Sequence, residues 1–301
     1  MEYTKIPLSL SDQADLLISR GLIADKYELI EQLSFLNYYR LTAYLYPYRN
    51  VDNSFRQGTS LELILYHYEF DRNLRFLMMD AIERIEVAIR SHIAYLFSHH
   101  YGPFGYTEKS NLPGISDDVF GSWLSEIRFD TIKSKETFVE HFRVAYGDNH
   151  TDLPIWMLVE VVSFGKIYTL FRGIDNSLQK TISGLFSVND VIFNSWIKTI
   201  NYVRNICAHH GRLWNRELAI KPYLPRRNKY PEWHRPFTMQ NNKIFSILSV
   251  MVYLLGIINK KNHWKEELCK LISDYNQIDI SEMGFSKHWM SHEIWSKGKN
   301  Y

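Results

Sequence analysis

The sequence predicts an all-α fold, and three observations lead to that prediction. Residues 59–101 contain neither glycine nor proline, and their apolar side chains recur at spacings of three or four, as on one stripe of a long helix. No alternation of apolar and polar residues, the pattern of a half-buried strand, extends over more than a few positions. The chain is 46% hydrophobic and holds only 14 Gly and 9 Pro among 301 residues, so it can bury a large core. A disordered or low-complexity protein is excluded.

The other helices are predicted from the same periodicity and from residues that start or stop a helix. Three short helices are expected before the long one, over residues 9–20 (between Ser9 and Gly21), 26–36 and 38–46. Residues 101–122, rich in Gly and Pro, are typical of a loop. The helices predicted after that loop cover residues 122–145, 154–172, 176–186, 189–210 and 240–258, and a polar tail follows.

No Gly/Ser-rich linker and no internal repeat divides the chain. We therefore expect one structural unit, in which residues 1–58 form an N-terminal helical extension packed on a helical domain of residues 59–301.

Charge and cysteine content exclude several classes of protein. The 35 Lys and Arg nearly balance the 33 Asp and Glu, so the net charge of +2 gives no global footprint for nucleic acid or a membrane. Cys207 and Cys269 are too few for a disulfide framework. No signal-peptide pattern opens the chain, and its most apolar stretch, residues 244–258, is shorter than the roughly 20 residues that cross a bilayer. We expect a cytoplasmic protein with no membrane partner.

Residues 200–217, INYVRNICAHHGRLWNRE, carry the most informative pattern. If they continue one helix, at about 100° per residue, two arcs separate. The polar arc holds Asn201, Asn205, His209, Arg212 and Arg216. The apolar arc holds Trp196, Ile200, Val203, Ile206, Cys207, His210 and Trp214. His209 is therefore the candidate for chemistry, and His210 is expected to pack or to support it with a hydrogen bond. Gly211 is a position at which the helix could end before the two arginines.

The polar arc and the neighbouring Arg204 suit chemistry on a phosphodiester. A histidine with an ordinary pKa of about 6.5 can take or deliver a proton near neutral pH. An arginine can hold phosphate oxygens and stabilise the charge that builds up on them. In RNA the 2′-hydroxyl supplies the nucleophile, so neither a metal nor a protein nucleophile is required. The same residues also fit an ordinary solvent-exposed helix face.

These residues carry a resemblance to known proteins. RNICAH, residues 204–209, resembles the Arg-Asn-x-x-x-His signature of HEPN ribonucleases, and CAHHGRLWNRE is similar to the Abi-like (abortive infection, AbiD/AbiF type) bacterial proteins. Four further blocks resemble that family in the same order: FLNYYRLTAYLYPYR, YEFDRNLRFLMMDAIERIEVAIRSHIAY, LPIWMLVEVVSFGKIYTLF and MGFSKHWMSHEIW. Ser286 departs from the proline that the family tends to have in the last block.

The resemblance implies a HEPN-like helical bundle with metal-independent endoribonuclease activity, in phage defence or as the toxin of a toxin–antitoxin system. Arg204 and His209 would be the catalytic pair, with Asn205 orienting them. It also implies an RNA substrate, a homodimer, an RNA or protein antitoxin, and neither a cofactor nor a metal. The alternatives are a non-catalytic HEPN protein that binds RNA or an antitoxin, and a scaffold that docks a partner enzyme.

Residues 212–236 form a basic segment directly after this motif. Seven Lys or Arg face two Glu there, a local balance of +5, and aromatic residues and prolines are interleaved. Basic side chains neutralise phosphates and aromatic rings stack on unpaired bases. The segment is thus either an RNA-contacting loop or a plain surface loop. The residues assigned to RNA binding are Arg212, Arg216, Lys221, Arg226, Arg227 and Lys229.

Two carboxylates are candidates for supporting the site. Glu83, on the long helix, is expected either to orient Arg204 or His209 or to form an ordinary surface ion pair. Glu160 lies inside an apolar run, where a buried carboxylate would need a partner such as an arginine of the motif. An exposed position at the edge of that run is the alternative.

Overall fold

The computed structural model describes residue 2 and residues 6–296, and it confirms the all-α fold within them. Isolated bridges are the only β-type pairings in the described residues. In chain order the helices are α1 Leu10–Ser19, α2 Lys26–Leu36, α3 Tyr38–Leu45, α4 Leu61–Tyr101, α5 Asp117–Lys133, α6 Thr137–Tyr146, α7 Ile155–Val161, α8 Phe164–Gly173, α9 Asn176–Leu185, α10 Asp190–Ala208, α11 Ile244–Ile258, α12 Trp264–Asp274 and α13 Glu293–Ser296.

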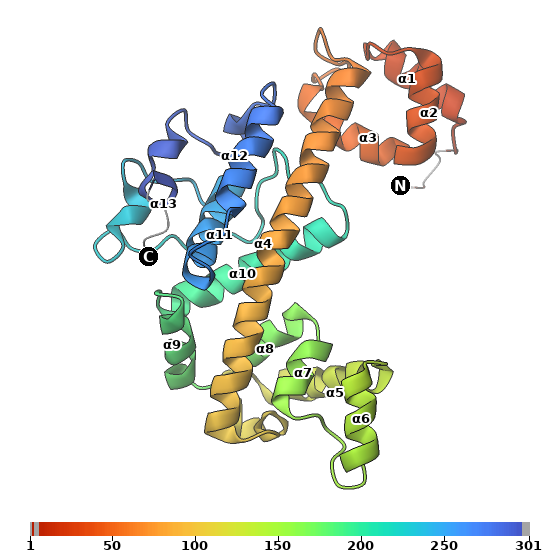
Figure 1. Cartoon of the computed structure of the whole chain (residues 1–301). Coiled ribbons are helices and arrows are strands. Elements are labelled where there is room, and N and C mark those ends of the chain that lie inside the picture. The colour runs from red at the N-terminus through yellow and green to blue at the C-terminus, as the bar shows by residue number, and fades with distance from the viewer. Residues whose placement is uncertain (1, 3–5, 297–301) are drawn as a thin grey trace.

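Helix α4 runs through the middle of the molecule (Figure 1). Its 41 residues extend about 60 Å at 1.5 Å per residue. Ser60 caps its start by accepting the N–H of Leu63, and Gly102, with φ +77, ends it. Its buried stripe packs against α3 near one end, α7 toward the other, and α10, α11 and α12 between.

The N-terminal helices α1, α2 and α3 gather at the start of α4 (Figure 1). Ser9 and Asp25 cap α1 and α2 close to the predicted starts. Asn37, with φ +62, ends α2, and its side chain caps α3 through the N–H of Tyr39. The chain therefore turns sharply there, and α3 packs against α4. The division into residues 1–58 and 59–301 stays a prediction, and the outermost residues of both ranges lie outside the described residues.

Two stretches that were expected as single helices are each split. Residues 122–145 contain the end of α5 and most of α6, and α5 begins earlier than expected because Ser116 caps it. Residues 154–172 contain α7 and α8, with Val162 extended between them. Arg90 of α4 donates to the carbonyls of Val159 and Val162, so a tertiary contact satisfies the end of α7.

The C-terminal part places α11 in the core and α12 beside it. Helix α11 has 12 buried residues among 15, as its uniform apolarity predicts. Helix α12, inside the expected polar tail, was not predicted, and Trp264 and Leu268 attach it to the core. Among the described helices, none is both long enough and apolar enough to cross a bilayer.

Candidate active site

The candidate site is built on the end of α10. Asn189 starts this helix by accepting the N–H of Ile192 at 2.9 Å, as predicted, but the helix stops at Ala208. His210 takes the left-handed conformation, with φ +57. The N–H groups of His210 and Gly211 then bond back to the carbonyls of Cys207 and Ile206, at 3.0 and 2.8 Å. This pairing is a Schellman motif, and it turns the chain away from the helix axis.

Gly211 is required in this turn by close approach. A β-carbon at this position would lie 3.0 Å from a side-chain carbon of Ile206 and 3.2 Å from its carbonyl oxygen. The absence of a side chain at Gly211 lets the turn close tightly on Ile206, while His210 takes the left-handed position that glycine usually fills in this motif.

The early end corrects the predictions that assumed a continuous helix. His210 is exposed rather than packed on the apolar face of α10. Trp214 is buried, but its ring packs against His67 of α4, with ring centres 4.4 Å apart. Arg212 and Arg216 lie beyond the turn and do not continue the polar stripe of the helix.

The three residues proposed as catalytic lie on the last turns of α10 and its cap. Asn205 and His209 are exposed one turn apart, and the N–H of His209 donates to the carbonyl of Asn205 at 3.0 Å. Arg204 is half-buried. Its Nε is buried without a hydrogen-bond partner among the described residues, and none of the ion pairs found there involves its guanidinium. Their catalytic roles stay predictions.

His209 opens onto a groove between α3 and the turn after α10. The groove has a volume of about 410 Å³. Its lining residues are Asn37, Tyr39, Arg40, Ala43, Tyr44, His209, His210, Gly211 and Arg212. Arg40 and Arg212 bring two guanidinium groups to it, and no carboxylate is among the lining residues. Arg204 is not among the residues that line this groove.

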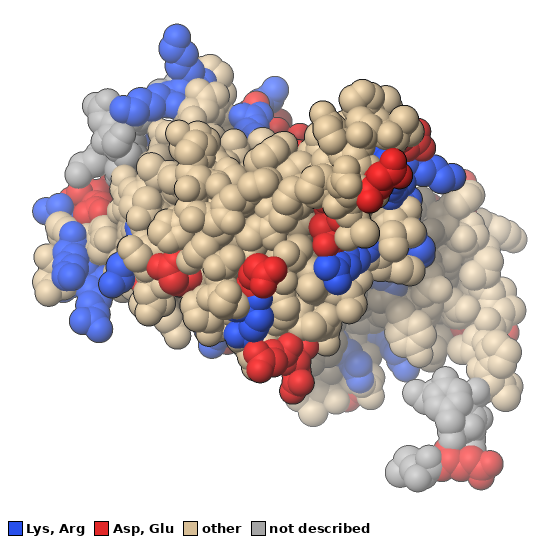
Figure 2. Space-filling model, turned by 90° about the horizontal axis from the view of Figure 1, so that it is seen from below, with Lys and Arg blue, Asp and Glu red and all other residues tan. Residues whose placement is uncertain are grey.

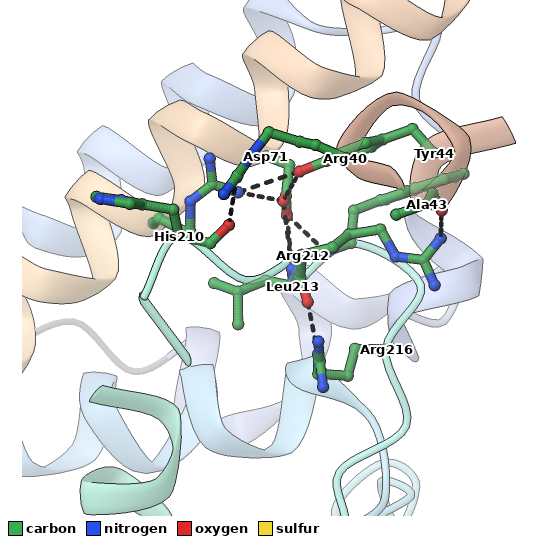
Figure 3. A network of polar contacts seen from close by, with 10 residues as sticks. Arg40, Ala43, Tyr44, Asp71, His210, Arg212, Leu213 and Arg216 are labelled. Atoms are coloured by element: carbon green, nitrogen blue, oxygen red, sulfur yellow. Dashed lines mark hydrogen bonds and ion pairs between the residues drawn. The ribbon is translucent and has the colours of Figure 1, made fainter. Parts of the chain in front are cut away.

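A buried carboxylate, Asp71 of α4, anchors the chain that follows the turn (Figure 3). It accepts the hydroxyl of Tyr44 at 2.6 Å and forms an ion pair with Arg75. It also accepts the backbone N–H groups of Leu213 and Trp214, at 3.0 and 2.6 Å. Burial raises the pKa of Asp71, and these four donors oppose that shift by stabilising the ionised form.

The same turn is held by two arginines that bond to backbone carbonyls. Arg40 of α3 donates to the carbonyl of His210 at 2.8 Å, and Arg212 donates to the carbonyl of Ala43 (Figure 3). The N-terminal helices and the end of α10 are thus joined in both directions across the groove.

Sequence reasoning missed the anchor, although a signal for it was present. Asp71 lies three residues before Leu74 and seven before Met78, on the apolar stripe of α4. A carboxylate on a core-facing stripe needs buried donors. Arg75 lies one helical turn after Asp71, but the other three donors, Tyr44 and two backbone N–H groups, come from distant parts of the chain and could not be named from periodicity.

The two carboxylates expected to support the site are both exposed. The structure shows no hydrogen bond or ion pair, within the described part of the chain, from Glu83 or Glu160 to Arg204 or His209. The prediction that Glu160 is buried is therefore wrong. Glu160 lies on the exposed side of α7, whereas Leu158 and Val159 are among the buried residues of that helix. The alternative of an exposed edge position is the one observed.

The six basic residues assigned to RNA binding are divided by the structure. Arg212 and Arg216 are half-buried near the anchored turn, where Arg216 donates to the carbonyl of Arg212. Lys221, Arg226 and Lys229 are exposed and line hollows beside the first half of α10. The remaining residue, Arg227, is exposed and approaches the hydroxyl of Thr238. In Figure 2, Lys and Arg gather toward the left edge of the face shown.

Cys207 is removed from chemistry by burial, which raises its pKa to about 12. Among the described residues no three His, Cys, Asp or Glu side chains gather closely enough to hold a metal ion.

The profile of the Abi-like protein family matches residues 31–215, more than half of the chain. The chain belongs to the Abi-like family. The match begins in α2 and ends in the anchored turn, so it includes Tyr44, Asp71 and the Arg204–His209 motif. The hollows beside the first half of α10 are lined partly from the matched region and partly from residues 219–230, which lie beyond it. Searches among curated proteins and among solved structures each found no match.

Proposed function

We propose that this protein is a metal-independent endoribonuclease of the HEPN type, acting in phage defence by abortive infection or as the toxin of a toxin–antitoxin system. Membership of the Abi-like family supports the defence role. The observation that carries the chemistry is the exposed His209, within the matched region and at a groove without a carboxylate. Two arginines line the groove, and each keeps further N–H groups beyond the one that it donates to a backbone carbonyl. Such a groove favours a phosphate group.

In the proposed reaction the RNA supplies its own nucleophile. The 2′-oxygen bonds to the adjacent phosphorus as its proton leaves, and the bond from phosphorus to the 5′-oxygen breaks as that oxygen gains a proton. His209 transfers protons at this centre, and arginine guanidinium groups stabilise the charge on the phosphoryl oxygens. The products are a 2′,3′-cyclic phosphate, or its hydrolysed form, and a 5′-hydroxyl.

A homodimer is part of the proposal. Arg204 and His209 are about 140° apart around the helix, and Arg204 does not line the groove of His209. Two copies related by a twofold axis would surround one phosphate with both motifs, so that Arg204 of the partner subunit could complete the site. Full activity of a monomer in dilute solution would contradict this part.

A non-catalytic protein that binds RNA or an antitoxin is the second candidate. One observation favours it: within the described residues no side chain donates to or accepts from the ring of His209. Catalytic histidines are usually oriented by such a third group. In that case the same groove would hold a phosphate without cutting the chain.

The test is cleavage of RNA by purified wild type, His209→Ala and Arg204→Ala. We expect both substitutions to abolish cleavage, EDTA to leave wild-type cleavage intact, and circular dichroism to show folded variants. His141→Ala is the matched control, because His141 is an exposed histidine on α6. Cleavage retained in both variants would refute the assignment, and RNA binding without cleavage by wild type would favour the second candidate.

A further inference from the structure

Helix α10 carries a polar stripe that runs back from His209 toward its first turns. The residues of this stripe are Asn194, Lys198, Asn201, Asn205 and His209. Their spacings of three and four keep them within about 80° of one another around the helix. Lys198, Asn205 and His209 are exposed, and the other two are half-buried. The stripe extends about 22 Å along the axis, the length of a few unpaired nucleotides.

The first half of the stripe forms one wall of an open cavity of about 680 Å³. Asn194 and Lys198 line it from α10, Arg172 lines it from α8, and Lys221 lines it from the segment after the anchored turn. The three cations are exposed, and no carboxylate is among the lining residues. None of the ion pairs found in the described residues involves these three side chains. Lys221 lies near enough to Glu217 to lower the pKa of that carboxylate, and Arg172 lies over the ring of Tyr168, so Lys198 is the cation of the three with neither kind of neighbour among the described residues.

A second hollow, of about 470 Å³, continues the first along the chain. Both are lined by Val191 and Tyr223, and the second adds Arg226 and Lys229 together with one carboxylate, Asp190. The two hollows thus form one basic groove beside α10.

Tyr223 stands where the two hollows meet, and its backbone is fixed on α10. Its N–H donates to the hydroxyl of Ser195, and its carbonyl accepts the indole N–H of Trp196, both at 2.9 Å. Its side chain remains 57% exposed. An exposed ring on a fixed backbone suits stacking of an unpaired base.

Asn194 adds a polar group without a partner. Its Oδ1 is buried and accepts no hydrogen bond from the described residues, although the residue lines the cavity. A buried acceptor normally has a donor. Because the oxygen itself is buried, a ligand in the cavity would reach it only after the Asn194 side chain turns toward the opening.

We propose that this groove binds the unpaired RNA that flanks the cleaved bond. Arg172, Lys198 and Lys221 would contact phosphates, Tyr223 would stack on a base, and the stripe on α10 would lead the strand to His209. This inference rests on the proposed function for the choice of RNA. It favours single strands over duplexes, because paired bases do not present their faces to a tyrosine ring.

The test measures binding separately from cleavage, in the His209→Ala background. The probe is a fluorescently labelled single strand of about 12 nucleotides, a length within the range of known single-strand sites, and a hairpin of the same length is the duplex comparison. Tyr223→Ala is expected to weaken binding of the single strand by roughly 5- to 150-fold, the range for loss of one stacked base. Tyr223→Phe keeps the ring and should bind as the parent does.

The phosphate contacts are tested by Lys198→Ala combined with Lys221→Ala. Loss of two contacts should lower the slope of log affinity against log salt concentration by about 1.4, at roughly 0.7 per contact. Lys133→Ala combined with Lys135→Ala removes two exposed lysines elsewhere and should leave the slope unchanged. Parental affinity in both groove variants, or equally tight binding of the hairpin, would overturn the proposal.

The outcomes separate this inference from the proposed function. If the groove variants lose binding while wild type cleaves no RNA, the groove stands and the endoribonuclease assignment fails. In the other case wild type cleaves RNA, the groove substitutions leave binding unchanged in the His209→Ala background, and they leave cleavage unchanged in the wild-type background. The endoribonuclease assignment then stands and the groove is wrong.

Discussion

The two halves of the basic segment 212–236 contain the same kinds of side chain and use them differently. In the first half, Arg212 and Arg216 turn inward, and both donate to backbone carbonyls. After Arg216, Lys221 and, in the second half, Arg226 and Lys229 remain exposed beside α10. The net charge of a segment therefore does not tell how many of its cations can meet a ligand.

The difference follows from where the helix ends. The turn after Ala208 leaves backbone groups that no helix satisfies, and nearby charged side chains take them. Asp71 accepts two backbone N–H groups, while arginines donate to carbonyls on both sides of the groove. Farther along the chain, backbone groups of Tyr223 are bonded by Ser195 and Trp196, which leaves the basic side chains free.

The largest expected effect is loss of the anchor of the first half. Asp71→Ala should lower the free energy of unfolding by about 3–5 kcal/mol, because Arg75 is left as an unpaired buried charge and two N–H groups lose their acceptor. Urea denaturation measures it. Asp148→Ala, at an exposed aspartate, is the control and should change stability by less than about 0.5 kcal/mol. A loss below about 1 kcal/mol in Asp71→Ala would mean that the anchor does not hold the turn.

An arginine from each half provides the direct contrast. Arg212→Ala should lower the free energy of unfolding by roughly 1.5–3 kcal/mol, the value for a hydrogen bond with a charged donor. Arg226→Ala should stay within about 0.5 kcal/mol and instead weaken RNA binding. Thermal or urea unfolding and binding of a labelled single strand measure the pair. If Arg226→Ala lowered stability and Arg212→Ala weakened only RNA binding, the distinction between the two halves would be wrong.

The smallest effect is a pH dependence in the anchored half. Burial lowers the pKa of His67, whose ring packs on Trp214, so the folded chain keeps it neutral while the unfolded chain protonates it below about pH 6.5. The unfolded state then binds more protons, and stability should fall as the pH drops through that value. In His67→Leu the fall in melting temperature between pH 7.5 and 5.5 should be smaller. An unchanged or steeper fall would contradict the conclusion that His67 is neutral in the folded chain.

Periodicity predicted the interior of the helices well and their ends less well. The stripes of α4 and α11 could be recognised because many apolar residues repeat along each. The break between α7 and α8 could not, because Arg90 of α4, which satisfies carbonyls at the break, comes from a distant part of the sequence. Helix α12 was missed because few of its residues are buried.

The candidate site shows the same division. Asn205 and His209 were expected on one exposed face of a helix, and the structure places them there. His210 itself takes the left-handed conformation just before Gly211. A helical wheel assumes one continuous helix and cannot represent that turn. The apolar neighbours of Glu160 left a buried and an exposed position open, and the structure shows the exposed one.

The proposed role of His209, at the end of α10, is to cut RNA. The most direct measurement is sequencing of cellular RNA ends after brief expression of wild type and of His209→Ala. We expect new 5′-hydroxyl ends, paired with 2′,3′-cyclic phosphate or its hydrolysed form, in cells that express wild type and not in cells that express His209→Ala. The same new ends in both, or no new ends with wild type, would contradict it.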